Sequence, residues 1–208
     1  MIEATAAVRS VRTVGSQTIA LDIETPATFA PKPGQFVKLT AFVDGEHVSR
    51  FYTLSSPVVA DTFELTVGID DEEGTLAPWL HDAAGEEVVI EGPYGRAYYD
   101  GEPVILVLAG GPGIGAAVGI GEAAEADGHN AAIVYRGEEP AHTDRLAALD
   151  RAGIDVEIVE QLDEAVAEYL QPETTVFVFG FQSFVTDALA AIEAAGGSPD
   201  DAKVENFG

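Results

Sequence analysis

The sequence has 208 residues and is 47% hydrophobic, which is enough for one large domain or two small ones with a packed core. Its 36 acidic and 10 basic residues give a net charge of −26, and such a field repels nucleic acid and anionic membranes, so we expect neither as a partner. The absence of cysteine excludes disulfides, a thiol nucleophile and a cysteine-ligated iron–sulfur cluster.

The first half of the chain predicts a β domain. Polar and apolar residues alternate on both sides of the turn signal Gly15-Ser16, and Asp44-Gly45 predicts a hairpin. The patterns predict a short helix over 75–82, after an acidic turn at 70–73, and strands over 4–13, 18–24, 35–43, 46–56, 62–69 and 87–91. Many short strands are typical of a small barrel, so we expect an antiparallel Greek-key β-barrel over residues 1–98.

The second half alternates strands and helices. Residues 104–109 form a continuous apolar run, as in a strand buried within a parallel sheet. Further strands are predicted over 131–135, 156–159, 175–180 and 202–207, and helices over 116–126, 144–152, 163–170 and 184–195. This alternation predicts an α/β domain with a doubly wound parallel sheet over residues 99–208.

The sequence predicts neither a membrane-spanning helix nor a metal site. No apolar run approaches the roughly 20 residues of a membrane helix, and the chain does not start with a basic segment followed by an apolar one. We therefore expect a soluble cytoplasmic protein. The four histidines are scattered without metal-site spacing, so we expect no metal.

One candidate binding strand contains Arg50, Tyr52 and Thr53, followed by Leu54 and Ser55. In a strand, Arg50 and Tyr52 point to the same face, and a guanidinium beside an aromatic ring suits a ligand with a phosphate and a flat ring. Thr53 offers a hydroxyl and an amide to such a ring. Taken alone, the run is more often an edge strand with a surface arginine.

Two further segments carry weaker signals. Gly74, Thr75 and Leu76 stand at a predicted helix start, where free amides and the helix dipole can hold a phosphate. Taken alone, this segment is equally well explained as a helix cap. Residues 92–95, Gly-Pro-Tyr-Gly, read as a turn that closes the barrel.

A glycine loop follows the apolar strand and precedes a predicted helix. That context favours nucleotide binding over a plain tight turn, because glycines let the backbone approach a pyrophosphate at a helix start. The residues of this loop are Gly110, Gly111, Gly113, Ile114 and Gly115.

The order of these motifs resembles the ferredoxin–NADP reductase superfamily over the whole chain. That family has an Arg-x-Tyr-Ser/Thr strand, a Gly-x-x-Ser/Thr helix start, a Gly-Pro-aromatic-Gly turn, a Gly-Gly-x-Gly-Ile loop, a Cys-Gly-Pro-like loop and a C-terminal Glu-x-Phe. The corresponding segments here are 50–53, 74–77, 92–95, 110–114, 179–181 and 205–207. The sequence departs from the pattern at Ala77, where a hydroxyl is usual, and at Phe179 and Phe181, where Cys and Pro are usual.

The resemblance implies FAD on the barrel and NAD(P)H on the α/β domain. Tyr52 would pack on the isoalloxazine and Thr53 would bond near flavin N5, while Arg50 and the amides of 74–76 would hold the FAD pyrophosphate. The loop 110–115 would hold the NAD(P)H pyrophosphate. Near the nicotinamide would lie Gly180, Glu205 and Phe207. Thr53 and Glu205 are thus the predicted catalytic residues, and Leu54 and Ser55 are predicted to join the FAD site.

The resemblance implies an enzyme that passes electrons from NAD(P)H through FAD to a separate acceptor such as a ferredoxin, a flavodoxin or an oxygenase component. A free flavin reductase is a second version of this hypothesis. The alternative is a flavin-binding module without turnover, in which Phe179 and Phe181 block the nicotinamide.

The choice of nicotinamide depends on the end of the second parallel strand, which meets the adenine ribose. Arg136 lies there, and Arg145 from the next helix could join it to clamp the 2′-phosphate of NADPH. Glu138 and Glu139 follow at once and would repel that phosphate. We favour NADPH as the nicotinamide, because two arginines lie in this stretch.

The excess of acids has two explanations: an acidic docking surface for a basic partner, or adaptation to a salt-rich cytoplasm. We favour salt adaptation, because the acids are spread along the whole chain and only three lysines occur. This composition resembles that of proteins from salt-loving archaea.

Salt adaptation predicts that the melting temperature rises steeply with KCl. Repulsion among the 36 acids destabilises the fold in dilute buffer, and screening relieves it as the Debye length falls to about 3 Å at 1 M. Thermal unfolding at a series of KCl concentrations measures this. A melting temperature that does not change with salt contradicts the prediction and favours the docking surface.

Overall fold

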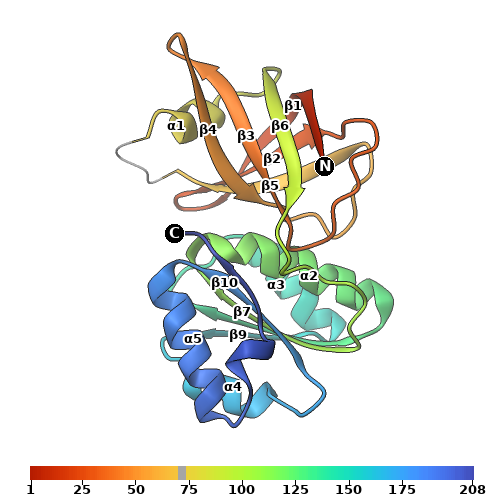
Figure 1. The fold of residues 1–208 in the computed structure, drawn as a ribbon, viewed down its shortest axis with the longest axis vertical. Helices are drawn as coiled ribbons and strands as arrows, with labels where there is room; N and C mark the ends of the chain where they lie inside the picture. The colour runs from red at the N-terminus through yellow and green to blue at the C-terminus, as the bar shows by residue number, and fades with distance from the viewer. Residues whose placement is uncertain (70–73) are drawn as a thin grey trace.

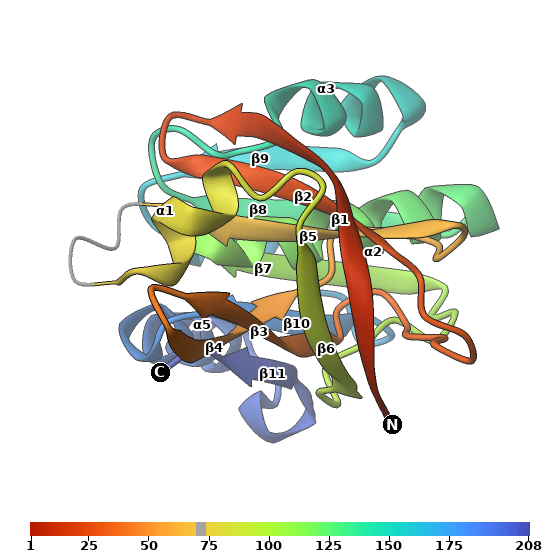
Figure 2. The same cartoon turned by 90° about the horizontal axis from the view of Figure 1, so that it is seen from above.

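The computed structural model describes residues 1–69 and 74–208, and it shows a β domain stacked on an α/β domain (Figure 1). The acidic turn predicted at 70–73 lies outside the described residues. Figure 2 looks onto the barrel, which covers one side of the α/β domain. The N-terminus lies on the barrel and the C-terminus lies between the two domains.

The N-terminal domain is a curled antiparallel sheet in the strand order β4-β3-β6-β1-β2-β5. A bridge between Leu54 and Leu65 joins its two edges. Its interior is lined by the alternate apolar side chains that the sequence pattern places on one face. The elements are β1 (Ile2–Gly15), β2 (Thr18–Glu24), β3 (Phe36–Val43), β4 (Glu46–Thr53), β5 (Thr62–Gly68), α1 (Leu76–His81) and β6 (Glu87–Tyr94).

The ends of β4 and β6 differ from the sequence prediction. We predicted that β4 continues to residue 56, but it ends at Thr53, because Leu54 and Ser55 turn away to pair with β5. We also expected a turn over 92–95, but β6 continues to Tyr94, which pairs with Phe36. Both differences arise from pairing between segments distant in the sequence, which a local pattern does not reveal.

The C-terminal domain is a five-stranded parallel sheet in the order β11-β10-β7-β8-β9. Helices α2 and α3 pack on one face, towards the barrel, and α4 and α5 pack on the other (Figure 1). The predicted alternation is confirmed by β7 (Val104–Gly110), α2 (Ile114–Asp127), β8 (Asn130–Arg136), α3 (Thr143–Ala152), β9 (Asp155–Val159), α4 (Asp163–Tyr169), β10 (Thr175–Gly180), α5 (Gln182–Ala194) and β11 (Lys203–Asn206). Short 3₁₀ turns occupy Gly111–Gly113 and Pro199–Asp201. Within the described residues, no helix has the length and apolar character needed to cross a membrane.

Helix α2 touches the barrel through two glycines one turn apart. A methyl group on Gly115 would lie 2.7 Å from the Thr66 side chain in β5. A methyl group on Gly119 would lie 3.1 Å from the carbonyl of Ser55. The backbone of α2 therefore lies directly against the barrel, at a distance that a larger side chain would increase.

We predict that Gly119→Val destabilises the protein by about 1–3 kcal/mol, the usual cost of overpacking a close contact. The branched side chain would press on the backbone of Ser55 and Ser56. Ala126→Val, on the exposed side of the same helix, is the matched control. Equal midpoints for the two variants in denaturant unfolding would show that the approach of α2 to the barrel is not tight.

Candidate functional site

The barrel carries a hollow of about 120 Å³ where two of the predicted motifs meet. Arg50 and Tyr52 come from β4, and Gly74 and Leu76 come from the start of α1. Tyr52 is half-buried and packs against the barrel core. The remaining lining residues are Phe51, Gly68 and Ala77. Positions more than twenty residues apart in the sequence thus form one concave surface with a guanidinium and an aromatic ring.

Arg50 keeps its charge available in a strongly acidic protein. Its guanidinium donates a 2.9 Å hydrogen bond to the carbonyl of Ser49, and it has no carboxylate partner among the residues that the structure describes. Four other arginines, Arg9, Arg12, Arg136 and Arg145, are each paired with a carboxylate. A free guanidinium beside a helix start is suited to an anionic ligand.

The three residues after Tyr52 leave the hollow. Thr53 is buried at the end of β4, opposite Phe36. The side chains of Leu54 and Ser55 are buried in the protein, and their amides donate to the carbonyls of Gln35 and Glu64. This placement does not favour the predicted contact of Leu54 and Ser55 with FAD. Thr75, at the other motif, is exposed and its hydroxyl makes no helix-cap hydrogen bond.

The glycine loop between β7 and α2 has one open position. Gly111 has a φ of +54°, is exposed, and would carry a methyl group into open space, 3.9 Å from the ring of Phe181. Gly110 and Gly113 are instead required by packing, because their methyl groups would meet Phe184 at 2.6 Å and the carbonyl of Phe179 at 2.3 Å. The side of Gly111 on which a side chain would stand is therefore open, while its backbone forms a hydrogen bond with Tyr135.

The other members of this loop face inwards. Ile114 is buried in the core between the parallel sheet and helices α2 and α3, and Gly115 lies against the barrel. Their predicted contact with NAD(P)H stays a prediction, and it involves backbone atoms only. Among the described residues, no three His, Asp or Glu side chains gather in an arrangement that could hold a metal ion.

The two phenylalanines that replace Cys and Pro have different positions. Phe179 is fully buried and reaches across to Gly34, so it cannot stand in front of a nicotinamide. Phe181 is 51% exposed, next to Gly111, and packs edge-on against Phe207 with ring centroids 6.1 Å apart. Any obstruction of the nicotinamide by these residues would therefore come from Phe181.

The C-terminal segment contains Glu205 and Phe207, the last of the residues that we predicted to lie near the nicotinamide. The amide of Phe207 donates to the carbonyl of Gly180 at 3.0 Å. Glu205, in β11, lies beside Gly95 and Phe36 of the barrel. Burial raises the pKa of the Glu205 carboxyl above its ordinary value, which favours its neutral form. Glu205 thus lies at the boundary of the two domains, near the strand that carries Thr53.

Arg136 stands at the end of β8 and is already engaged. It donates to Asp187 at 2.7 Å and lies over the ring of Phe184, 4.9 Å from its centroid. Together with Gln161 and Asp163 it lines a hollow of about 230 Å³ between β9 and α5. Arg145, which we expected to join Arg136, is engaged elsewhere, with Glu64, Glu122 and Ser55.

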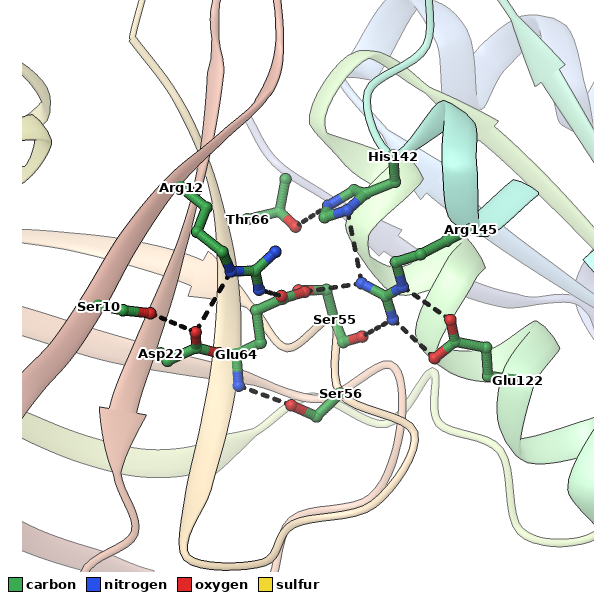
Figure 3. Close-up of polar contacts among 10 residues, drawn as sticks. All are labelled: Ser10, Arg12, Asp22, Ser55, Ser56, Glu64, Thr66, Glu122, His142 and Arg145. Atoms are coloured by element: carbon green, nitrogen blue, oxygen red, sulfur yellow. Dashed lines mark hydrogen bonds and ion pairs between the residues drawn. The ribbon is translucent and has the colours of Figure 1, made fainter. Parts of the chain in front are cut away.

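The sequence analysis missed a polar cluster between the two domains (Figure 3). We call it the interdomain cluster, and its members are Ser10, Arg12, Asp22, Ser55, Ser56, Glu64, Thr66, Glu122, His142 and Arg145. No motif could have indicated it, because its members come from six separate segments. The imidazole of His142 lies 2.8 Å from the Thr66 hydroxyl, and burial, with the charge of Arg145 beside it, lowers the pKa of His142 to about 4.

Comparisons with known proteins agree with the geometry of the barrel. Residues 5–99 match the family model of the oxidoreductase FAD-binding domain. Glycine betaine monooxygenase reductase subunits from Chromohalobacter salexigens and Pseudomonas aeruginosa are each 39% identical to this chain over 103 residues, or 47% of this chain. The matched region is 28% of each relative, so the chain spans well under half the length of these proteins.

Solved structures share the whole two-domain fold. The ferredoxin NADP⁺ reductase of Neisseria gonorrhoeae, with bound FAD and NADP, has a TM-score of 0.81 at 19% identity and covers 99% of both chains. The flavohem-like FAD/NAD binding domain of nitric oxide dioxygenase from Vibrio cholerae has a TM-score of 0.84 at 19% identity and covers 98% of both chains. Residues 5–99 thus match an oxidoreductase FAD-binding domain, and the whole chain has the two-domain fold of these solved structures.

Proposed function

We propose that this chain is a flavin-dependent reductase that takes electrons from NAD(P)H and passes them through FAD to a separate acceptor. The observation that carries the proposal is that each of the two adjoining domains has a candidate site for one of the two cofactors. The barrel has the hollow with Arg50 and Tyr52, and the α/β domain has the open loop at Gly111. The match of residues 5–99 to an FAD-binding domain supports the first site.

The residues present fit FAD at the barrel. Arg50 has no carboxylate partner among the described residues and would hold the pyrophosphate, with the amides at the start of α1. Tyr52 offers a ring face against the barrel core, and Thr53 would lie near the flavin edge. When bound, the flavin supplies the chemistry of accepting a hydride and releasing electrons.

The residues of the α/β domain fit a nicotinamide dinucleotide. The glycine loop at the exposed Gly111 would hold the pyrophosphate, and Arg136 would lie at the adenosine end. Gly180, Phe207 and Glu205 would border the nicotinamide, and burial raises the pKa of the Glu205 carboxyl there.

The acceptor is a separate protein, and we propose an oxygenase component as its class. The curated relatives are named reductase subunits of a glycine betaine monooxygenase, which indicates an oxygenase partner for them. This sequence holds no cysteine to ligate an iron–sulfur cluster, so any cluster that takes electrons from the flavin would lie outside it. We further propose that the chain works in a salt-rich cytoplasm, as its charge of −26 indicates, and that it comes from a salt-loving archaeon.

A second candidate function is a flavin-binding module without turnover, and the exposed ring of Phe181 favours it. Anaerobic titration of the FAD-loaded protein with NADH and with NADPH separates the two. Bleaching of the flavin absorbance by either nicotinamide supports the reductase. A flavin that neither nicotinamide reduces, but that dithionite does, supports the module.

We predict that Arg50→Ala weakens FAD binding roughly tenfold to hundredfold, which is the usual contribution of a charge-assisted hydrogen bond. Flavin fluorescence during FAD titration measures the dissociation constant. Arg9→Ala is the matched control, because it removes the same charge from a surface ion pair on the barrel. Equal affinities in the wild type and Arg50→Ala would exclude Arg50 from the FAD site.

We predict that Arg136 sets the preference for NADPH and that Asp187 limits it. Arg136→Ala should lower the ratio of kcat/KM for NADPH over NADH roughly tenfold, the value of one charge-assisted contact. Asp187→Asn should raise the ratio, because it frees the guanidinium from a carboxylate 2.7 Å away. Arg151→Ala, an exposed arginine of α3 that donates to a carbonyl of its own helix, is the control. A wild-type ratio below one that Arg136→Ala leaves unchanged contradicts NADPH as the substrate.

A further inference from the structure

One guanidinium from the α/β domain joins three segments of the protein. Arg145, in α3, binds both carboxylate oxygens of Glu122 in α2, at 2.7 and 2.8 Å. It also donates to the carboxylate of Glu64 in β5 at 2.7 Å and to the carbonyl of Ser55 at 2.6 Å. Glu64 and Ser55 belong to the barrel, so Arg145 connects the two domains directly (Figure 3).

The barrel end of this connection is the segment that follows Thr53. The Ser55 hydroxyl donates to the Glu64 carboxylate at 2.6 Å, and the Ser55 amide donates to the Glu64 carbonyl at 2.9 Å. The Glu64 amide in turn donates to the Ser56 hydroxyl at 2.6 Å. Every polar group of Ser55 is therefore bound, and this residue is fully buried. The segment cannot shift without breaking these contacts.

At the α/β end, the connection is made to α2, the helix that follows the glycine loop. Glu122 lies one turn after Gly119, where an added methyl group would meet the carbonyls of Ser55 and Ser56 at 3.1 and 3.3 Å. The carbonyl of Ser55 thus accepts a hydrogen bond from Arg145 and also lies next to α2. A second contact supports this one, because His142 at the start of α3 meets Thr66 of the barrel, next to Gly115.

We propose that Arg145 is a positioning residue for hydride transfer. It fixes α2, and with it the loop at Gly111, against the segment that begins at Thr53, and so it sets the separation between the nicotinamide and the flavin. This inference rests on the proposed reductase function. Arg145 lies among carboxylates and a carbonyl of the protein, away from the Arg50 hollow and the Arg136 hollow, so it acts through other residues.

The chain contains a matched control for this role. Arg12, in β1, also pairs with the carboxylate of Glu64, but both residues belong to the barrel. Arg12 and Arg145 therefore neutralise the same carboxylate from opposite sides, and only Arg145 crosses to the other domain. A variant of Arg12 removes a charge from Glu64 without removing the connection between domains.

The experiment is stopped-flow reduction of the FAD-loaded protein in molar KCl, with the nicotinamide that reduces the wild type faster. Its rate at saturation is compared for the wild type, Arg145→Gln, Arg145→Lys, Glu64→Gln and Arg12→Gln. The FAD dissociation constant and the flavin midpoint potential are measured on the same proteins, because a loss of the FAD site would change them.

We expect Arg145→Gln to slow flavin reduction roughly tenfold to hundredfold, the effect of a small misplacement of reacting groups. FAD affinity and flavin potential should stay at their wild-type values, and Arg12→Gln should reduce at the wild-type rate. A nicotinamide deuterated at the transferred position should show a larger isotope effect in Arg145→Gln, because hydride transfer then limits the rate. If Arg145→Gln does not fold, Arg145→Lys and Glu64→Gln test the same role. We expect both to slow flavin reduction, but by a smaller factor.

Three results would overturn the inference. The first is a folded Arg145 variant that reduces at the wild-type rate. The second is an equal loss of rate in Arg12→Gln, which would show a general effect of charge at Glu64. The third is a loss explained by weaker FAD binding. If neither nicotinamide reduces the wild type, the proposed function itself is wrong, and the positioning role is wrong with it.

Discussion

The arrangement of the two domains depends on how closely helix α2 approaches the barrel. The helix begins at Ile114, directly after the loop containing Gly111, and presents Gly115 to Thr66 in its first turn and Gly119 to Ser55 one turn later. A side chain at either glycine would hold the domains apart. The same helix thus carries a candidate nucleotide loop and the contact that places this loop against the FAD-binding domain. The geometry between the two halves of the site follows from backbone packing, and the polar contacts of Arg145 add to it.

Much of the fold could be predicted because its signals are local. Alternation along β1 to β6 and the strand–helix order after residue 100 were both readable from the sequence, and the hollow at Arg50 and Gly74 joined two predicted motifs. The interdomain cluster could not be predicted, since Arg145 finds its partners 23, 81 and 90 positions away. The end of β4 was misplaced for the same reason, because Ser55 leaves the strand to bond with Glu64.

The motif glycines serve packing as well as any ligand. Gly110 and Gly180 both make room for the ring of Phe184, and Gly113 makes room for the backbone of Phe179. A loop of this composition therefore would be needed even if no nucleotide bound there. Gly111 differs, because its left-handed φ and open surroundings have no packing explanation within the protein. Among these motif glycines, Gly111 is therefore the one whose surroundings indicate a ligand.

The isolated charge of Arg50 has a consequence for how quickly an anionic cofactor arrives. FAD approaches a protein of net charge −26, so the long-range field repels it, while Arg50 attracts it over the last few ångströms. Salt screens the long-range repulsion more than the short contact, since the Debye length falls from about 10 Å at 0.1 M to about 3 Å at 1 M. Association with FAD should therefore become faster as salt is added, the reverse of the usual behaviour of charged ligands steered to an oppositely charged protein.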